Sequence, residues 1–580
     1  MEKHSNFDRV MEAGDHFKNG AGSKSHTSRG YIINDLIKTK ISLFAFVFFI
    51  SAFSTYAQLM PGNVGPRGNS YDDPANGIYV APDGNDATAT GSIGSPYKSI
   101  NAALAAAQPG ATVILRGGTY HEGTEVRPRI PNVTVKSRRG EWAVIELIYD
   151  PGIEWDSGVY FDTEASGCKL QCVEVKGGFY AVCMETTFQW DPADPFTYGA
   201  SNIIIEDCIL HDSRYDVVKV KPNCNNITIR YNEIYNSGQA FTPPYYGEDN
   251  AEGIDNVNGN NMIVQNNYIH DIVGTGVYAK GGATDALIEN NIIERIYGAG
   301  IMVGFDTNLE WFSSNVNPDY YENIRGVVCN NLIIDAGWEG IGLYASKDAK
   351  VYNNTLINAV CGVSQYHSAI YFGVAPQDYD DNIGHPANIN PDIHHNVVCM
   401  WPTSNRPMID IRYSLDCGGM SALSGMPAIH DNCYYIAGKS ASFNDQRPGS
   451  ILENKGLAEW KTHTGGDNGS LEVNPALDAN YITANTQCAG MGILFPLILN
   501  NPTGIAHQAL LPETSAYINN GILYIQNPVA ETVRAYSING ALLFNLQKPE
   551  GKVSYPMNQP GGTTIILMGG SGWTKKLFVQ

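Results

Sequence analysis

Charged residues are scarce in this chain of 580 residues, because Asp, Glu, Lys and Arg together make up only 16% of it. With 60 Gly and 30 Pro, this composition argues against a helical or a disordered chain and favours a large, turn-rich β protein. Basic residues are the scarcer sign, 37 against 58 acidic ones, which gives a net charge of −21. A nucleic acid partner is therefore disfavoured, since its phosphates would be repelled.

Several common functional motifs are missing. The sequence has no phosphate-binding loop, no nucleophile elbow and no zinc-binding helix. Its eleven Cys lack the spacing of a metal finger, and their number is odd. We therefore expect most of them to be small core residues, while one or two disulfides remain possible after export.

Long hydrophobic runs are also absent. The apolar run 41–50 is too short for a membrane span, but Lys38 and Lys40 precede it and small residues follow it up to Ala57. This pattern predicts a polar prefix and signal peptide over 1–57, with a linker over 58–75. We expect a secreted protein, extracellular or at the cell surface, without a membrane span.

What the chain does contain is a repeated four-residue motif with Asn at its second position. The spacing between successive Asn residues is 35, 24, 40, 23 and 42. A period near 24, Val, Ile and Leu alternating with polar residues, and turns rich in Gly and Asn predict the rungs of a parallel β-solenoid, as in PbH1 repeats. The six repeats are 231–234, 266–269, 290–293, 330–333, 353–356 and 395–398.

The repeated Asn has a structural explanation. Parallel strands stacked in a solenoid place equivalent positions above one another, so Ile, Val and Leu form internal columns. An Asn at one turn position can hydrogen-bond to the Asn of the next rung, and Asn also tolerates the left-handed backbone of tight turns. We therefore interpret these Asn residues as architectural.

The start of the solenoid carries a further signal. An Ala-rich stretch, 101–108, predicts a short amphipathic helix, and 112–120 predicts the first strand, so the helix would cap the open end of the coil. With 79–86 and 95–100, this opening resembles the N-terminal cap of secreted right-handed parallel β-helix proteins of the pectate-lyase-like superfamily. The resemblance implies an all-β fold with a right-handed parallel β-helix over 76–505.

The end of the chain is different, because 510–580 contains short alternating strands and closes on a basic, apolar tail, 572–580. This predicts a separate small β domain. Its segment 533–540 and the tail resemble the C-terminal sorting domains of Bacteroidota secreted proteins. An ordinary small β-sandwich appended to an enzyme is the alternative.

Three insertions make some rungs longer than the minimal period. They are 239–250, 305–323 and 373–390, and alignment by rung places all three beside one strand column. Loops that border one column on neighbouring rungs form the walls of a groove. The loops also carry aromatic residues, whose flat faces suit sugar rings.

On that column, charged residues interrupt the apolar pattern. If Val218, Ile254 and Val277 point inward, then Lys219, Lys221, Asp255 and Lys280 point outward, with Asp216 beside Glu252 at the strand entrance. Rungs stack about 4.8 Å apart, so the carboxylates of Asp216, Glu252 and Asp255 can converge. Such a cluster needs a proton or a cation, and hard oxygen ligands favour Ca²⁺.

The series Asp216, Glu252-Gly253-Ile254-Asp255 and Lys280-Gly281-Gly282 resembles the ordered series in pectate lyases of polysaccharide lyase family nine. The resemblance implies that Asp216, Glu252 and Asp255 bind calcium and that Lys280 is the base. In this chain, Ala251 and Glu252 replace Asp residues of the family pattern. Lys221 is a competing base, because 216–221 resembles the strand that bears the catalytic Lys of chondroitinase-B-like and alginate lyases.

These resemblances imply a polysaccharide lyase that cleaves an acidic, uronic-acid-containing polysaccharide by β-elimination, as a monomer. Three alternatives stay open. The chain could be a glycoside hydrolase with paired carboxylates, or a non-catalytic sugar-binding solenoid or adhesin. The charged cluster could also be a solvated ladder of ion pairs without any ligand.

Overall fold

The computed structural model describes residues 62–148, 156–188, 196–239, 250–362, 366–377 and 380–500, and beyond them the strands between 515 and 578. The predicted signal peptide, 1–57, lies outside the described residues. Among the helices that the structure does describe, none has the length and the apolar character needed to cross a membrane.

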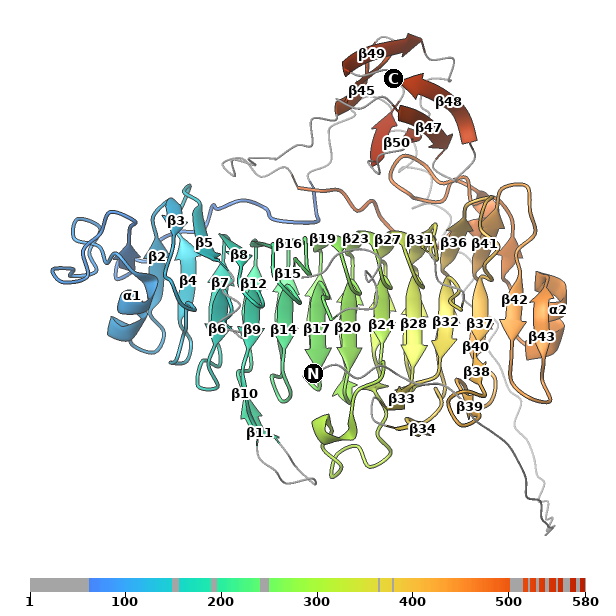
Figure 1. Ribbon diagram of the computed structural model, residues 1–580, viewed down its shortest axis with the longest axis horizontal. Helices are drawn as coiled ribbons and strands as arrows, with labels where there is room; N and C mark the ends of the chain where they lie inside the picture. The colour runs from blue at the N-terminus through green and yellow to red at the C-terminus, as the bar shows by residue number, and fades with distance from the viewer. Residues whose placement is uncertain are drawn as a thin grey trace, which may run out of the picture. The chain divides into compact units, whose positions relative to one another are not determined.

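Three long sheets run along the coil, and consecutive strands of the chain pass from one sheet to the next (Figure 1). The first sheet contains β1 (Ile78–Val80), β2 (Thr112–Leu115), β4 (Thr134–Ser137), β7 (Lys169–Gln171), β12 (Ile204–Glu206), β15 (Thr228–Arg230), β18 (Ile263–Gln265), β22 (Leu287–Glu289), β26 (Val327–Cys329), β30 (Lys350–Tyr352), β35 (Asp392–His394) and β40 (Ala428–His430). The second contains β3 (Gly118–Tyr120), β5 (Ala143–Leu147), β8 (Val173–Gly177), β13 (Ile209–His211), β16 (Glu233–Tyr235), β19 (Tyr268–Ile272), β23 (Ile292–Ile296), β27 (Leu332–Ala336), β31 (Thr355–Ile357), β36 (Val397–Met400), β41 (Cys433–Ile436) and β44 (Leu471–Glu472).

The third sheet carries the candidate site. It contains β6 (Val159–Phe161), β9 (Val182–Met184), β14 (Val218–Val220), β17 (Ile254–Val257), β20 (Val277–Lys280), β24 (Ile301–Val303), β28 (Ile341–Tyr344), β32 (Ile370–Gly373), β37 (Ile409–Ile411), β42 (Phe443–Asp445) and β43 (Leu452–Lys455). Its strands pair in parallel except β43, which is antiparallel to β42. The predicted parallel β-helix is therefore confirmed.

Short elements fill the turns and insertions. They are β10 (Thr186–Phe188), β11 (Phe196–Gly199), β21 (Ala283–Thr284), β25 (Asn323–Ile324), β29 (Ser346–Lys347), β33 (Pro376–Gln377), β34 (Asp380–Gly384), β38 (Tyr413–Ser414), β39 (Met420–Ser421) and the 3₁₀ turns η1 (Leu309–Trp311) and η2 (Thr486–Cys488).

The core consists of stacked apolar columns. In the third sheet, Val218, Ile254, Val277, Ile301 and Ile341 are register partners on successive rungs and are fully buried. Because side chains alternate along a strand, the residues beside these positions face outward. The same register that builds the core therefore aligns the outward residues of neighbouring rungs.

The repeated Asn residues form a buried ladder between the first and second sheets. The side-chain amide of Asn291 donates to Asn331 Oδ1 (2.9 Å), and that of Asn331 donates to Asn354 Oδ1 (3.0 Å). The residue before each ladder Asn, such as Asn290 or His395, takes the left-handed backbone (φ 59° and 55°). The predicted ladder is present. One Asn was expected both to bond to the next rung and to take the left-handed backbone, but the ladder Asn makes the bond and the residue before it takes that backbone.

Replacement of a ladder residue should destabilise the solenoid. In Asn331→Ala, the carbonyl of Ile288 and the backbone amide of Asn291 lose their buried partners. We expect a loss of about 2–4 kcal/mol in the free energy of unfolding, since each such group costs about 1–3 kcal/mol. Urea denaturation followed by circular dichroism measures it. The exposed Asn480→Ala should change stability by no more than about 0.5 kcal/mol; equal losses would contradict the ladder's role.

Helices lie at both ends of the coil (Figure 1). At the N-terminal end, α1 (Ile100–Ala106) is capped by Ser99, whose hydroxyl accepts from Ala102 N at 3.2 Å, and buries Ile100, Ala103 and Leu104. The predicted capping helix is confirmed. At the other end, α2 (Leu457–Thr464) buries Trp460 against Phe443, with ring centroids 5.4 Å apart.

The described part of the segment predicted as a linker, 58–75, contacts the solenoid. Val64 forms a parallel bridge with Leu499, and the Arg67 guanidinium lies 2.7 Å from the buried carboxylate of Asp207. Ordered contacts of this kind reduce the freedom that a linker would have.

Beyond the solenoid, the strands form two antiparallel sheets, with orders β45-β46-β49 and β48-β47-β50-β51. Their bounds are β45 (Ser515–Asn519), β46 (Ile522–Asn527), β47 (Glu531–Ser537), β48 (Leu542–Lys548), β49 (Gly551–Pro556), β50 (Thr564–Gly569) and β51 (Thr574–Phe578). The sorting role of this region stays a prediction.

Candidate active site

The outward positions of β14, β17 and β20 bring charged residues from three rungs together. Lys219 is the register partner of Asp255, and Asp255 is the partner of Tyr278. Just before these strands, the backbone amide of Glu252 donates to Asp216 Oδ1 at 2.9 Å. The solenoid register therefore places residues 36 positions apart in direct contact.

Three carboxylates converge in this cluster. Asp216, Glu252 and Asp255 each offer an oxygen, and these atoms lie within 4.8 Å of one another. All three side chains are buried, with at most 3% of each residue exposed. Among the described residues, Glu252 Oε2 and Asp255 Oδ1 have no hydrogen-bond partner. Two buried oxygens are thus left for a ligand or a proton.

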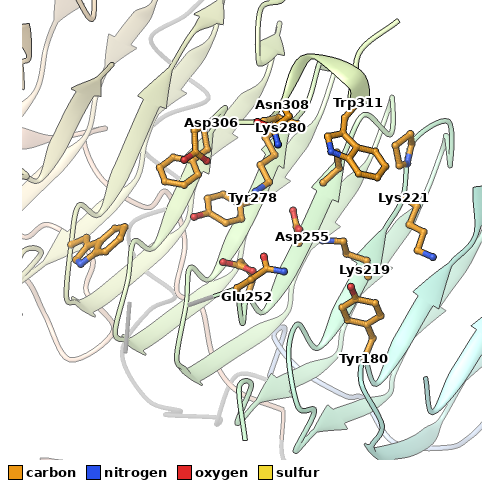
Figure 2. Close-up of a pocket in the computed structure, with 16 residues that line it drawn as sticks. Tyr180, Lys219, Lys221, Glu252, Asp255, Tyr278, Lys280, Asp306, Asn308 and Trp311 are labelled. Atoms are coloured by element: carbon orange, nitrogen blue, oxygen red, sulfur yellow. Dashed lines mark hydrogen bonds and ion pairs between the residues drawn. The ribbon is translucent and has the colours of Figure 1, made fainter. Parts of the chain in front are cut away.

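Lys219 supplies a positive charge inside the cluster. Its Nζ lies 3.2 Å from Asp216 Oδ2. It also pairs with Asp255 Oδ2 (Figure 2). The sequence predicted Lys219 on the outer face, but its place between the two carboxylates was not predicted. The strand register could have indicated it, because the alignment of the inward Val218 with Ile254 makes Lys219 and Asp255 neighbours.

The charges set the protonation of the site. Burial, and then the Asp216 and Asp255 carboxylates, raise the pKa of Glu252 well above its usual value, which favours its protonated form. Burial also opposes the ionisation of Asp255, but Lys219 and Lys280 outweigh it and lower the Asp255 pKa. The pKa values of the two neighbouring carboxyl groups are therefore shifted in opposite directions.

The two candidate bases have different surroundings. Lys280 lies in the groove, with its Nζ 4.4 Å from the centre of the Tyr278 ring. Burial favours its neutral form, but Asp255, Glu252 and Asp306 outweigh burial and raise the Lys280 pKa. Lys221 pairs instead with Glu185 at 2.8 Å and points away from the carboxylates (Figure 2). The geometry therefore associates Lys280, more than Lys221, with the cluster.

A groove of about 810 Å³ is lined by two of the three carboxylates, Glu252 and Asp255. The insertion 305–323 provides one wall, with Asp306 and Trp311, and Trp338 lies further along. Trp338 was not predicted from the sequence as part of the site; it occupies on its rung the position that Ala251 occupies beside Glu252. Of the insertion 239–250, residues 240–249 lie outside the described residues, and Asn250 lines the groove. The remaining lining residues include Tyr180, Lys219, Lys221, Pro222, Val257, Tyr278, Phe305, Thr307 and Asn308.

The donor set fits a hard cation. It offers three carboxylates, two of whose buried oxygens lack a partner among the described residues, and such oxygens are the ligands that Ca²⁺ prefers. Lys219 competes for the same oxygens, since it already pairs with Asp216 and Asp255. A bound cation would have to share or displace that ammonium group.

The protonation of Glu252 can be tested through stability. Because its pKa is raised in the folded state, the folded protein binds more protons than the unfolded one, and stability falls as pH rises above the unfolded value of about 4.3. Glu252→Gln keeps the shape of the side chain but removes the group that binds the proton. Its free energy of unfolding should therefore decline less steeply than that of the unchanged protein above pH 5, in chelator. Identical slopes would show that Glu252 is ionised when folded.

A family model described as "Right handed beta helix region" matches residues 152–316 and 196–373. Together with the three parallel sheets, this match defines a right-handed parallel β-helix protein. A second model, described as "Protein of unknown function (DUF1565)", matches residues 82–132 around the N-terminal cap.

Among individual proteins, the chain is similar to pectate lyase PEL9 of Emericella nidulans, with 34% identity over 99 residues. The match covers 16% of this chain and 23% of that relative, so it spans less than a quarter of the relative's length. A solved structure of pectate lyase Pel9A aligns with a TM-score of 0.38 and 16% identity, over 57% of this chain and 77% of the other. The A-module of mannuronan C-5 epimerase AlgE6 from Azotobacter vinelandii aligns with a TM-score of 0.39 and 13% identity, over 65% and 94%.

Proposed function

We propose that this protein is a polysaccharide lyase that cleaves a uronic-acid-containing, pectate-like polysaccharide by β-elimination, with Lys280 as the base. The observation that carries the proposal is the convergence of Asp216, Glu252 and Asp255, two of which, Glu252 and Asp255, line the groove that also holds Lys280. The short similarity to a protein named pectate lyase supports the same substrate class. Secretion, a monomeric state and a sorting role for the C-terminal strands complete the proposal.

The groove suits an acidic sugar chain. Trp311 and Trp338 offer flat faces for sugar rings, and Lys219 and Lys280 offer positive charge for a uronate carboxylate. The protein as a whole carries a charge of −21. Over distances beyond about 8 Å at physiological salt, that charge is screened, so the local groups decide binding in the groove.

The reaction requires removal of the proton on C5 of the uronate. Lys280 Nζ takes this proton, the C5–H electron pair forms a double bond between C4 and C5, and the C4–O bond breaks with its electron pair on the leaving oxygen, which takes a proton from water. Calcium held by Asp216, Glu252 and Asp255 would supply positive charge to the uronate carboxylate, which makes the C5 proton easier to remove. Because its pKa is raised, Lys280 is protonated in the free protein, so activity should increase toward alkaline pH.

An absorbance assay tests the proposal directly. The purified protein is incubated with pectate, alginate and glycosaminoglycans, each with calcium and with chelator, while ultraviolet absorbance of the unsaturated product is recorded. We expect absorbance to increase on one uronate polymer, and more with calcium than with chelator. If no substrate yields an unsaturated product, the lyase proposal is wrong.

A glycoside hydrolase is the second candidate, and the opposite pKa shifts of Glu252 and Asp255 favour it. A protonated acid beside an ionised carboxylate is the pair that glycosidases use. The same incubations distinguish the two reactions, because a hydrolase releases reducing ends without ultraviolet absorbance. A sugar-binding solenoid would retain the polymer and produce neither signal.

A further inference from the structure

A second cluster of metal-ligating side chains lies at the turn between the first and second sheets, away from the groove on the third sheet. His394 at the end of β35 is the register partner of His430 at the end of β40. Their rings stack with centroids 4.9 Å apart and planes at 7°. The following residues, His395 and Asp431, occupy equivalent left-handed turn positions (φ 55° and 54°). On these two rungs, two adjacent columns of equivalent positions therefore carry residues that can bind a metal ion.

The donor atoms converge. His395, His430 and Asp431 each offer one ligand atom, and these atoms lie within 4.8 Å of one another. The Nδ1 atoms of His394 and His395 face each other at 2.9 Å. Two facing imidazole nitrogens must share a proton or bind a common ion, since two lone pairs at this distance repel.

The surroundings leave the cluster accessible. The side chains of His430 and Asp431 are both 42% exposed, so an ion can reach them from solvent. On the next rung, Gly469 occupies the position equivalent to Asp431. A Cβ atom at Gly469 would lie 1.8 Å from Asp431 Oδ1. Glycine therefore leaves room for the Asp431 carboxylate.

We propose that His395, His430 and Asp431 bind one divalent transition-metal ion, with His394 positioned beside His395 as a further donor. Imidazole nitrogens with one carboxylate suit zinc or a similar ion, whereas calcium prefers an all-oxygen set. An ion here joins two successive rungs through their side chains, so its role is structural. The site is independent of the reaction proposed for the groove.

Isothermal titration of the metal-free protein with zinc chloride tests the proposal. We expect one saturable site and a thermal midpoint higher by a few degrees at saturating zinc. In the double variant His395→Ala/His430→Ala, zinc affinity should fall at least about 100-fold. The matched control is His121→Ala, a more exposed His far along the chain that pairs with Glu146; it should bind zinc as the unchanged protein does.

Cobalt substitution provides a readout that needs no variant. Co²⁺ bound by nitrogen and oxygen should give visible ligand-field bands without the intense thiolate-to-metal absorption of a cysteine site. The buried pair Cys433 and Cys488, with sulfurs 3.2 Å apart, is the nearest competitor of that kind. Thiolate absorption, a stoichiometry unaffected by the double substitution, or no saturable binding would each overturn the proposal.

Discussion

Replacement of Lys280 by Met should reduce kcat by about 10³-fold on the polymer that the protein cleaves, since a general base contributes about 10²–10⁴-fold. Met keeps most of the length and the apolar stem of Lys280, but it lacks the Nζ that lies over the Tyr278 ring and cannot accept the C5 proton. Lys280→Arg should lose a similar factor, because Arg retains the positive charge and stays protonated. The measurement is initial rate by ultraviolet absorbance at saturating substrate.

Two comparisons make this result specific. Lys350→Met changes an exposed Lys of the first sheet, outside the groove, and should leave kcat within about twofold. Lys221→Met removes the competing base, which in the free protein pairs with Glu185. If Lys221→Met abolishes activity while Lys280→Met retains it, then Lys221 is the base. If Lys280→Arg stays active, Lys280 contributes charge only.

The winding of the chain could be predicted from sequence because the same physical constraint repeats on every rung. Each rung must place an Asn amide between two neighbours, so Asn291, Asn331 and Asn354 recur at a fixed offset from the buried Ile or Leu. The helix over 101–108 was predictable because a solenoid needs a cap. Segment 62–75 carries no repeat, and its contacts, such as Arg67 with Asp207, depend on residues about 140 positions away.

The candidate site was less predictable, for a reason that the geometry makes plain. Alternation along a strand shows which side chains point outward, and register shows which of them are neighbours. Neither alternation nor register gives the conformation that a long side chain adopts. Lys221 follows Val220, the register partner of Met184, and its Nζ meets Glu185, whereas Lys280 lies two rungs further on with its Nζ over the Tyr278 ring of its own strand. Trp338 was missed because nothing in its own rung marks it as part of a groove.

Lys219→Met should expose whether the carboxylate cluster is a cation site or an ion-pair ladder. In the unchanged protein, Lys219 neutralises Asp216 and Asp255 from within. Without it, and without any divalent ion, the buried carboxylates lose their paired charge, which costs about 3–5 kcal/mol in the free energy of unfolding. The matched control is Lys176→Met, which removes a half-exposed pair with Glu146 and should cost no more than about 1 kcal/mol.

Calcium should then reverse the loss. With the competing ammonium group removed, the oxygens of Asp216, Glu252 and Asp255 are left to a hard ion alone. We therefore expect the variant to bind calcium at least about tenfold more tightly than the unchanged protein, a difference of about 1.4 kcal/mol in binding free energy. Thermal unfolding in chelator and in millimolar calcium measures the effect: the variant's midpoint should depend strongly on calcium, and that of the unchanged protein weakly. If the variant unfolds at the same temperature in both buffers, the three carboxylates bind no cation, and the cluster is a set of ion pairs.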